Sequence, residues 1–373
     1  MHAGTAVFLS WRGRWSDSPR AISAELLRRN SPVRQVWVLE DGAGEPPAVV
    51  ERVAPGSPEE AEALAGARWV VSNDTLTMDW RKRPDCFYLQ TWHGTPLKKL
   101  GYDIAWPPYS GALHHYAVEL PRDVAKFDAM LSPNPFSTRV LRRSFRFAGP
   151  MLETGYPRND ILHGPDRATV RARVRQALGL AAGTQAVLYA PTWRDSLQHT
   201  LDRLDLELLR ERLGPGTTVL VRAHGYTAAS VHSGDGPGVR NVTGWPDIAE
   251  LYLAADVVVT DYSSSMFDVA GTGTPLLFYT YDLERYRDVI RGFNFDFAAQ
   301  APGPLLRTSA EVAEALRDVD AATAPFHERY AAFAARYCPW DDGGAAARVV
   351  DAVFGQDGPE LAGTSGHELA PAG

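Results

Sequence analysis

Two histidines follow apolar segments that have the composition of buried strands. His93 stands in Trp-His-Gly-Thr-Pro after residues 86–91, and His224 stands in Arg-Ala-His-Gly after residues 218–222. An imidazole can take or release a proton near neutral pH, and open α/β sheets bind ligands at the carboxyl ends of their strands. Both histidines are therefore candidate acid–base residues, although a histidine at a strand end can equally be structural.

A run of hydroxyl side chains forms a second candidate site. Residues 256–268 read Asp-Val-Val-Val-Thr-Asp-Tyr-Ser-Ser-Ser-Met-Phe-Asp, an apolar strand that leads into serines at the start of a helix. A helix N-terminus has unpaired N–H groups and a positive dipole end, so added hydroxyls favour a bound diphosphate. One serine could instead simply cap the helix. The residues predicted to bind the diphosphate here are Thr260, Asp261, Ser263, Ser264 and Ser265.

Basic residues accompany these segments. Arg222 lies two positions before His224 and could neutralise charge on a leaving diphosphate, and Arg194, in Pro-Thr-Trp-Arg-Asp, is a second candidate phosphate ligand. Near His93, a glycine allows a ligand or backbone to come close, and a lysine could serve an anionic substrate or only be solvated. The predicted supporting residues on this side are Gly94, Thr95, Lys98 and Asp268.

Metal ligands are not evident in the sequence. The pair His114 and His115 has no partner at metal-ligand spacing, and no acidic cluster requires an ion. We therefore predict that no metal or other cofactor is required, although Asp261 or Asp268 could hold Mg²⁺. Neither a dinucleotide fingerprint nor a Walker sequence is present.

The elements that position these residues alternate between strands and helices. A helix is expected over residues 19–29, and short apolar runs predict strands, which together indicate a parallel α/β fold. A turn-rich stretch at residues 155–160 predicts two domains, 1–160 and 161–354, followed by a disordered tail over 355–373. The expected strands are residues 6–9, 36–39, 69–72, 86–91, 129–132, 187–189, 218–222, 257–260 and 276–279.

Composition narrows the class of protein and its location. The 373 residues carry a formal charge of -7, which argues against a nucleic-acid partner. The two cysteines are far apart, which favours a reducing cytoplasm, and no apolar run is long enough to span a bilayer. A basic amphipathic segment could still bind an anionic membrane surface, or be an ordinary solvated helix face. Its arginines are Arg139, Arg142, Arg143 and Arg146.

Together these segments resemble the CDP-glycerol:poly(glycerophosphate) glycerophosphotransferases, the family of teichoic acid primases and polymerases. The resemblance extends through nearly the whole chain. It is carried by residues 13–22, 91–103, 131–134, 155–160, 190–195, 222–224, 247–252, 260–268, 277–287, 291–297 and 301–304.

The resemblance implies a GT-B-like architecture of two doubly wound domains, with the acceptor on the N-terminal domain and CDP-glycerol on the C-terminal one. It also implies a polyprenyl-diphosphate-linked acceptor, reached by a peripheral protein at the inner face of the membrane. His93 would be the base on the acceptor hydroxyl, while His224 and Arg222 would hold the diphosphate as CMP leaves.

Several alternatives remain open at this stage. The sequence departs from longer polymerases of the family, which have an extra N-terminal region, so the expectation of long-chain polymerisation is weaker and a primase that adds a single unit is an alternative. CDP-ribitol or a nucleotide sugar could replace CDP-glycerol as the donor. A non-catalytic lipid-binding assembly subunit is the alternative outside the enzymes, and the oligomeric state is not predicted.

Overall fold

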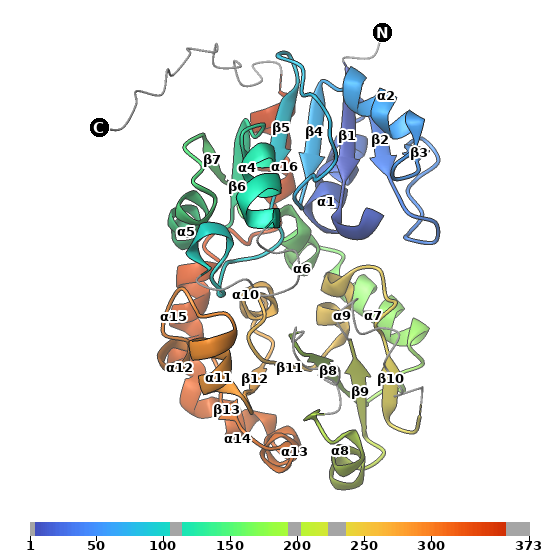
Figure 1. Ribbon diagram of the computed structural model, residues 1–373. Helices are drawn as coiled ribbons and strands as arrows, with labels where there is room; N and C mark the ends of the chain where they lie inside the picture. The colour runs from blue at the N-terminus through green and yellow to red at the C-terminus, as the bar shows by residue number, and fades with distance from the viewer. Residues whose placement is uncertain (1–3, 105–113, 193–202, 223–235, 356–373) are drawn as a thin grey trace, which may run out of the picture.

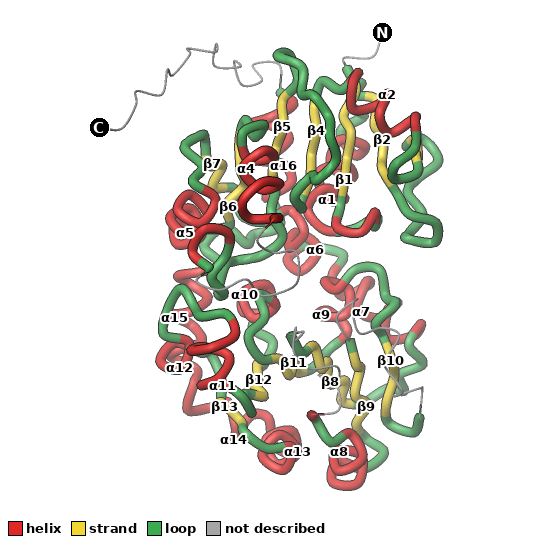
Figure 2. Tube along the Cα trace, in the orientation of Figure 1, coloured by secondary structure: helices red, strands yellow, loops and turns green. Residues whose placement is uncertain are grey.

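The computed structural model describes residues 4–104, 114–192, 203–222 and 236–355. Two parallel sheets lie one above the other, each with helices on both faces (Figures 1 and 2). The predicted α/β architecture of two doubly wound units is confirmed. The predicted disordered tail lies almost wholly outside the described residues.

The first sheet has seven strands in the order β3-β2-β1-β4-β5-β6-β7, and its neighbours pair in parallel. The chain reverses its direction of winding between β1 and β4, which is where open sheets of this kind present a ligand crevice. The strands are β1 (Thr5–Leu9), β2 (Arg34–Val38), β3 (Glu51–Val53), β4 (Trp69–Ser72), β5 (Phe87–Gln90), β6 (Ala129–Ser132) and β7 (Met151–Glu153).

The second sheet has six strands in the order β10-β9-β8-β11-β12-β13, again with parallel neighbours. Its winding reverses between β8 and β11, so the residues after these strands also lie at a crevice. The strands are β8 (Gln185–Ala190), β9 (Thr217–Val221), β10 (Val239–Asn241), β11 (Val257–Thr260), β12 (Leu276–Tyr279) and β13 (Leu305–Leu306).

Helices of the N-terminal half connect these parallel strands. The predicted helix over residues 19–29 is present as α1, and its first residue accepts a hydrogen bond from the Ser18 amide through Asp17 Oδ1 at 2.6 Å. The helical elements of this half are η1 (Trp11–Gly13), α1 (Asp17–Arg28), α2 (Pro58–Gly66), η2 (Gly101–Asp103), η3 (His115–Glu119), α4 (Leu120–Val124), α5 (Pro135–Phe145), η4 (Pro157–Asn159) and α6 (Asp160–His163).

Helices of the C-terminal half surround the second sheet in the same way. The capping box at the start of α13 pairs the side chain of Thr308 with Glu311. The elements are α7 (Arg167–Ala177), α8 (Leu206–Leu213), α9 (Ile248–Ala254), α10 (Ser265–Ala270), α11 (Leu283–Arg285), η7 (Tyr286–Ile290), α12 (Phe297–Gln300), α13 (Ser309–Arg317), α14 (Val319–Thr323), η8 (Ala324–Phe326), α15 (His327–Tyr337) and α16 (Ala345–Phe354).

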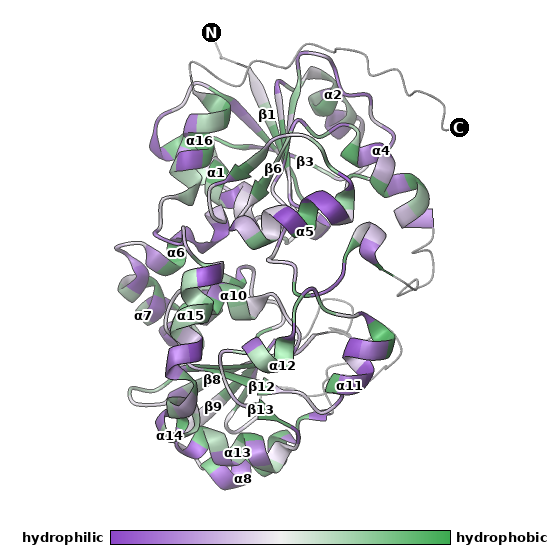
Figure 3. Ribbon diagram, turned by 90° about the vertical axis from the view of Figure 1, so that its left-hand side faces the viewer, coloured by the Kyte–Doolittle hydropathy of each residue, from purple (hydrophilic) through white to green (hydrophobic). Residues whose placement is uncertain are grey.

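Alternating residues of the strands fill separate cores on the two faces of each sheet. In β1, Ala6 and Phe8 join one core while Val7 and Leu9 join the other. This alternation follows from the two-residue period of a strand. Figure 3 shows each sheet enclosed between helices. Both faces are therefore covered, as is usual for a parallel sheet.

The last helix departs from the predicted domain assignment. Residues 161–354 were expected to form one C-terminal domain, but α16 packs on the first sheet, where Val349, Val350 and Val353 share a core with β1 (Figure 1). The Trp69 indole also donates to the Val353 carbonyl at 3.1 Å. The apolar stripe of α16 predicts that one face of this helix is buried, but it does not predict which of the two sheets the face packs against.

The two units are joined by apolar contacts as well as by the chain. Leu97, Phe136 and Val140 of the N-terminal half are buried in a core that belongs mostly to the C-terminal half. The Asn294 side-chain amide donates to the carbonyls of Pro96 and Lys98, at 2.9 Å each. These contacts fix the segment after His93 against the second unit.

The basic segment predicted as a possible membrane surface is helix α5 and the residues after it. Its apolar side chains are buried in the protein cores, while Arg139, Arg142, Arg143 and Arg146 are exposed. The segment therefore offers charge to a membrane but no apolar face. No helix in the described part of the chain is long and apolar enough to cross a bilayer.

Candidate active site

A cavity of about 340 Å³ lies between the carboxyl ends of the two sheets. Residues after β1, β4 and β5 line it from the N-terminal unit, and residues after β9 and β11 line it from the C-terminal unit. Both switch points of the fold therefore face the same space. The lining residues are Ser10, Trp11, Arg14, Ser16, Asp17, Asn73, His93, Arg158, Asn159, Arg222, Pro246, Asp247, Ile248, Ala249, Tyr252, Ser264, Ser265 and Asp268.

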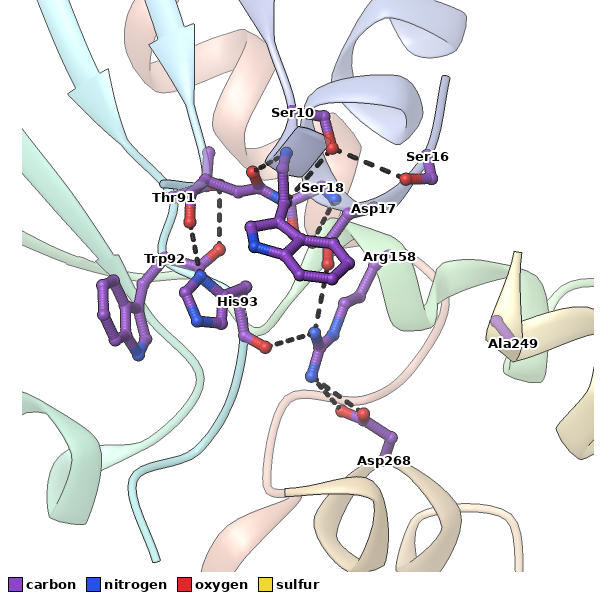
Figure 4. Close-up of polar contacts among 12 residues, drawn as sticks. Ser10, Ser16, Asp17, Ser18, Thr91, Trp92, His93, Arg158, Ala249 and Asp268 are labelled. Atoms are coloured by element: carbon purple, nitrogen blue, oxygen red, sulfur yellow. Dashed lines mark hydrogen bonds and ion pairs between the residues drawn. The ribbon is translucent and has the colours of Figure 1, made fainter. Parts of the chain in front are cut away.

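His93 lines the cavity three residues after the end of β5 (Figure 4). Its Nδ1 lies 2.6 Å from the backbone carbonyl oxygen of Asn73. Because a carbonyl can only accept, Nδ1 must carry a proton, and in the neutral ring Nε2 holds the lone pair. The residue is thus held in the tautomer that suits a general base acting through Nε2.

Trp92 supports the imidazole from one side. The two rings stack with centroids 4.2 Å apart, and Trp92 in turn packs edge-on against Phe145 at 4.7 Å. Trp92 has a φ of +54°, an unfavourable conformation for a residue with a side chain. The Trp92 amide donates to Gln90 Oε1 at 2.8 Å, so local contacts hold this turn and aim His93.

Asn73 connects His93 to the loop after β1. Its Oδ1 accepts from the Trp11 amide at 2.9 Å, and its Nδ2 donates to Ser10 Oγ at 3.3 Å. Ser10 and Asn73 directly follow β1 and β4, the two strands at the switch point. The hydroxyl and amide groups around His93 therefore belong to one connected network that joins the loops after β1, β4 and β5.

Arg158 joins the two halves of the site (Figure 4). Its guanidinium donates to both carboxylate oxygens of Asp268 at 2.8 Å, to Asp17 at 3.2 Å and to the His93 carbonyl at 2.5 Å. Burial alone lowers the pKa of Arg158, but the charges of Asp268 and Asp17 outweigh it and hold this pKa well above its usual value. Arg158 therefore stays charged and ties the His93 turn to α10.

Gly94 lies where the His93 turn and the start of α10 approach each other closely. A Cβ built on Gly94 would fall 2.6 Å from Ser264 Oγ and 2.8 Å from Ser264 Cβ. Any side chain at this position would push the His93 turn away from α10. The sequence predicted that Gly94 permits a close approach, and the approaching group is Ser264.

The predicted diphosphate residues divide into two groups. Ser264 and Ser265 line the cavity, and Ser263 Oγ lies 2.9 Å from Ser265 Oγ. Thr260 is fully buried and donates to the Ala190 carbonyl at 2.8 Å, while Asp261 accepts from the amides of Thr192 and Tyr262. The side chains of Thr260 and Asp261 hold backbone groups at the ends of β8 and β11 and do not line the cavity, so their contact with a diphosphate stays a prediction.

Arg222 lines the cavity at the end of β9. It donates to the carbonyls of Trp245 at 2.7 Å and Val242 at 3.4 Å. His224 and Arg194 fall outside the described residues, so their predicted roles stay predictions. The side chain of Arg222 is nevertheless positioned for an anion that enters from this end.

Thr95 and Lys98, the two predicted residues that follow Gly94 in the same segment, do not line the cavity. Thr95 is buried, and Lys98 pairs through its backbone with Phe293 of the C-terminal unit. Their segment is bound to the second unit by Asn294, so it fixes the position of the His93 turn. The predicted supporting role of Thr95 and Lys98 on the acceptor side stays a prediction, while Asp268 lines the cavity and pairs with Arg158.

Several lining residues had no predicted role. Ser10, Arg14, Asp17 and Arg158 lie in or next to the segments that carry the family resemblance, at residues 13–22 and 155–160. The position of Ser10 and Asn73 after the strands at a switch point was a usable signal. Within the described residues, no group of three or more His, Cys, Asp and Glu side chains has the arrangement of a metal site.

Comparison with known proteins places these features in a family. Residues 1–355 match the family described as CDP-Glycerol:Poly(glycerophosphate) glycerophosphotransferase. The chain is 35% identical, over 94% of its length, to the teichoic acid poly(glycerol phosphate) polymerase of Bacillus subtilis, but it covers 48% of that protein. It is 34% identical to the teichoic acid glycerol-phosphate transferase of Staphylococcus aureus. That match covers 93% of this chain and 92% of that protein. The chain thus spans about half of one relative and most of the other.

Solved structures agree with the fold. The wall teichoic acid polymerase TagF superposes with a TM-score of 0.85 and 31% identity, covering 93% of this chain and 88% of that chain. A TagF variant soaked with CDPG gives the same TM-score of 0.85. The UDP-GlcNAc 2-epimerase of Neisseria meningitidis has a TM-score of 0.55 at 12% identity, a likeness of fold alone. The fold is GT-B-like, as predicted.

Proposed function

The chain belongs to the CDP-glycerol:poly(glycerophosphate) glycerophosphotransferase family, and from this we propose that it transfers glycerol phosphate from CDP-glycerol to a hydroxyl of an acceptor. The acceptor is a polyprenyl-diphosphate-linked molecule or a growing teichoic-acid-like polymer, and CMP is released. The observation that carries the proposal is His93, held with Nδ1 protonated, in a cavity that arginines and serines also line.

The acceptor hydroxyl lies next to His93 in this mechanism. Its oxygen attacks the phosphorus that bears the glycerol, and His93 Nε2 takes the hydroxyl proton as the new P–O bond forms. The bond from that phosphorus to the bridging oxygen breaks, and the electron pair leaves with CMP. Positioning and charge stabilisation supply most of the rate enhancement, as is general for phosphoryl transfer.

The donor diphosphate lies toward the C-terminal unit. Arg222, Ser264 and Ser265 face the cavity there and can donate to phosphate oxygens. His224, by its resemblance to the family, would add a proton donor to the leaving group. We propose that these protein groups stabilise the developing charge without a required metal ion.

Activity measurement tests the proposal directly. Purified protein incubated with CDP-glycerol and a lipid-linked acceptor analogue is expected to release CMP and to add glycerol phosphate to the acceptor. CDP-ribitol in a parallel reaction tests the donor, and reactions with EDTA or added Mg²⁺ test the metal. Turnover of CDP-ribitol or a nucleotide sugar, but not of CDP-glycerol, would contradict the proposed donor.

Membrane attachment is a separate part of the proposal. We propose that the protein acts at the inner face of the membrane, because the acceptor is a lipid and because Arg139, Arg142 and Arg146 are exposed on one segment. Flotation with anionic vesicles is expected to carry the protein at low salt and release it at high salt, because the contact is electrostatic. The double variant Arg139→Glu with Arg142→Glu should not float with the vesicles. Equal flotation of the variant would contradict the assignment.

A further inference from the structure

Two of the arginines that line the cavity, Arg14 and Arg222, form no ion pair with a carboxylate in the described part of the chain. Of its six charged lining residues, Arg158 pairs with Asp17 and Asp268, and the remaining carboxylate, Asp247, pairs with Arg20 at 2.8 Å. Among the described residues, no ion pair joins a carboxylate to Arg14 or Arg222, which are the other two lining cations. Each of the three lining carboxylates is already engaged by another arginine.

The two arginines, Arg14 and Arg222, come from different halves of the protein. Arg14 lies in the loop after β1, and Arg222 directly follows β9. Burial lowers the pKa of Arg222 and the charge of Arg14 also lowers it, whereas Tyr252 and the carboxylate of Asp247 raise it. Burial also lowers the pKa of Arg14, together with the charge of Arg12. The two guanidiniums therefore repel each other across the cavity.

The loop that carries Arg14 has a defined conformation. The Gly13 amide donates to the Ser10 carbonyl at 2.9 Å, and the Glu40 amide donates to the Gly13 carbonyl at 3.0 Å. Gly13 has a φ of +59°, and a Cβ there would lie 2.8 Å from the backbone nitrogen of Glu40. The backbone thus places Arg14 at the cavity, where its guanidinium also lies over the Trp11 ring, 5.8 Å from the ring centroid.

We propose that Arg14 is a phosphate-binding residue of the N-terminal unit, which together with Arg222 clamps a phosphate group between the two units. A partly buried cation without a carboxylate partner is costly, and such groups concentrate at ligand sites. A phosphate or diphosphate accepts bidentate hydrogen bonds from guanidinium groups and cancels their repulsion. This proposal rests on the proposed function, because that function supplies the identity of the phosphate compound.

Two compounds could supply this phosphate. One is the diphosphate of the donor, and the other is a phosphate of the acceptor chain. In either case the ligand would draw the two units together around the cavity, because each unit supplies one of the two cations.

Calorimetric titration of the full chain with pyrophosphate, CDP-glycerol and glycerol 3-phosphate tests the clamp. Arg14→Gln is expected to weaken binding of pyrophosphate and CDP-glycerol by about 10- to 100-fold, while Arg14→Lys loses less because it keeps the charge. Arg12→Gln is the matched control, because Arg12 is exposed on the same loop and does not line the cavity. Its affinities should stay within about twofold of the wild type.

The outcomes separate the clamp from the proposed function. A loss confined to glycerol 3-phosphate supports the clamp and assigns it to the acceptor. If Arg14→Gln loses pyrophosphate binding, the clamp is supported. If the wild type also fails to bind CDP-glycerol, the proposal that CDP-glycerol is the donor is contradicted while the clamp stands. Unchanged affinity of Arg14→Gln for all three probes overturns the clamp. A melting temperature of Arg14→Gln equal to or above that of the wild type excludes a purely structural role.

Discussion

Replacing His93 by alanine is expected to lower kcat for glycerol phosphate transfer by about 10²- to 10⁴-fold, the usual contribution of a general base. The Asn73 carbonyl fixes the proton on Nδ1, so that Nε2 is free to take the proton of the acceptor hydroxyl. Donor binding should change little, because the proposed donor groups lie elsewhere in the cavity. The measurement is CMP release at saturating CDP-glycerol, with calorimetry for donor affinity.

Two further variants test whether the loss of activity comes from the basic nitrogen of His93. His93→Gln keeps an N–H that can donate to the Asn73 carbonyl but has no basic nitrogen, so it should be as inactive as alanine. His327→Ala is the control, because His327 is an exposed histidine at the start of α15. Activity of His93→Ala above about a tenth of the wild type would contradict a role as general base.

The central strands could be predicted from the sequence because they are buried on both faces. The expected strands at residues 69–72, 129–132, 257–260 and 276–279 coincide with β4, β6, β11 and β12. Long apolar runs of this kind are typical of parallel sheets. Predicted and observed ends differ by one or two residues in the other five strands.

The four strands that the sequence did not predict are all at sheet edges. β3 and β7 close the first sheet, and β10 and β13 close the second. Edge strands are short and need not be apolar, as Glu51 and Arg52 in β3 show. These segments become strands because they pair with a neighbouring strand. The residue pattern of the segment alone carries no information about that pairing.

The sequence predicted those residues of the candidate site that follow strands, but not the pairs between residues far apart in the chain. His93, Arg222, Ser264 and Ser265 follow strands, and the sheet topology brings them to one cavity. The role of Arg158 depends on partners 65 and 110 positions away in the chain. No spacing rule relates such residues, because only the packing of the two units brings them together.

Replacing Arg158 by methionine is expected to reduce the free energy of unfolding by about 3–5 kcal/mol, because it leaves Asp268 and Asp17 without their partner in a buried site. The side chains of Arg158 and Asp268 are only 11% and 5% exposed. The variant also loses the contact to the His93 carbonyl, so kcat should fall with stability. Urea unfolding and CMP release measure the two effects.

A surface pair provides the control for stability. Arg307 pairs with Glu284 at 2.7 Å, but both side chains are largely exposed, at 43% and 61%. Arg307→Met should therefore cost no more than about 1 kcal/mol. A similar loss in both variants would contradict the assignment of Arg158 to a buried network.

The double variant Arg158→Met with Asp268→Leu separates stability from positioning. Removing both members of the buried pair should recover much of the lost stability, because an apolar pair of similar size avoids the desolvation of isolated charges. Activity should remain low, because nothing then donates to the His93 carbonyl or ties the His93 turn to α10. Recovery of kcat together with stability would contradict this role, since the pair would then hold the fold without aiming the base.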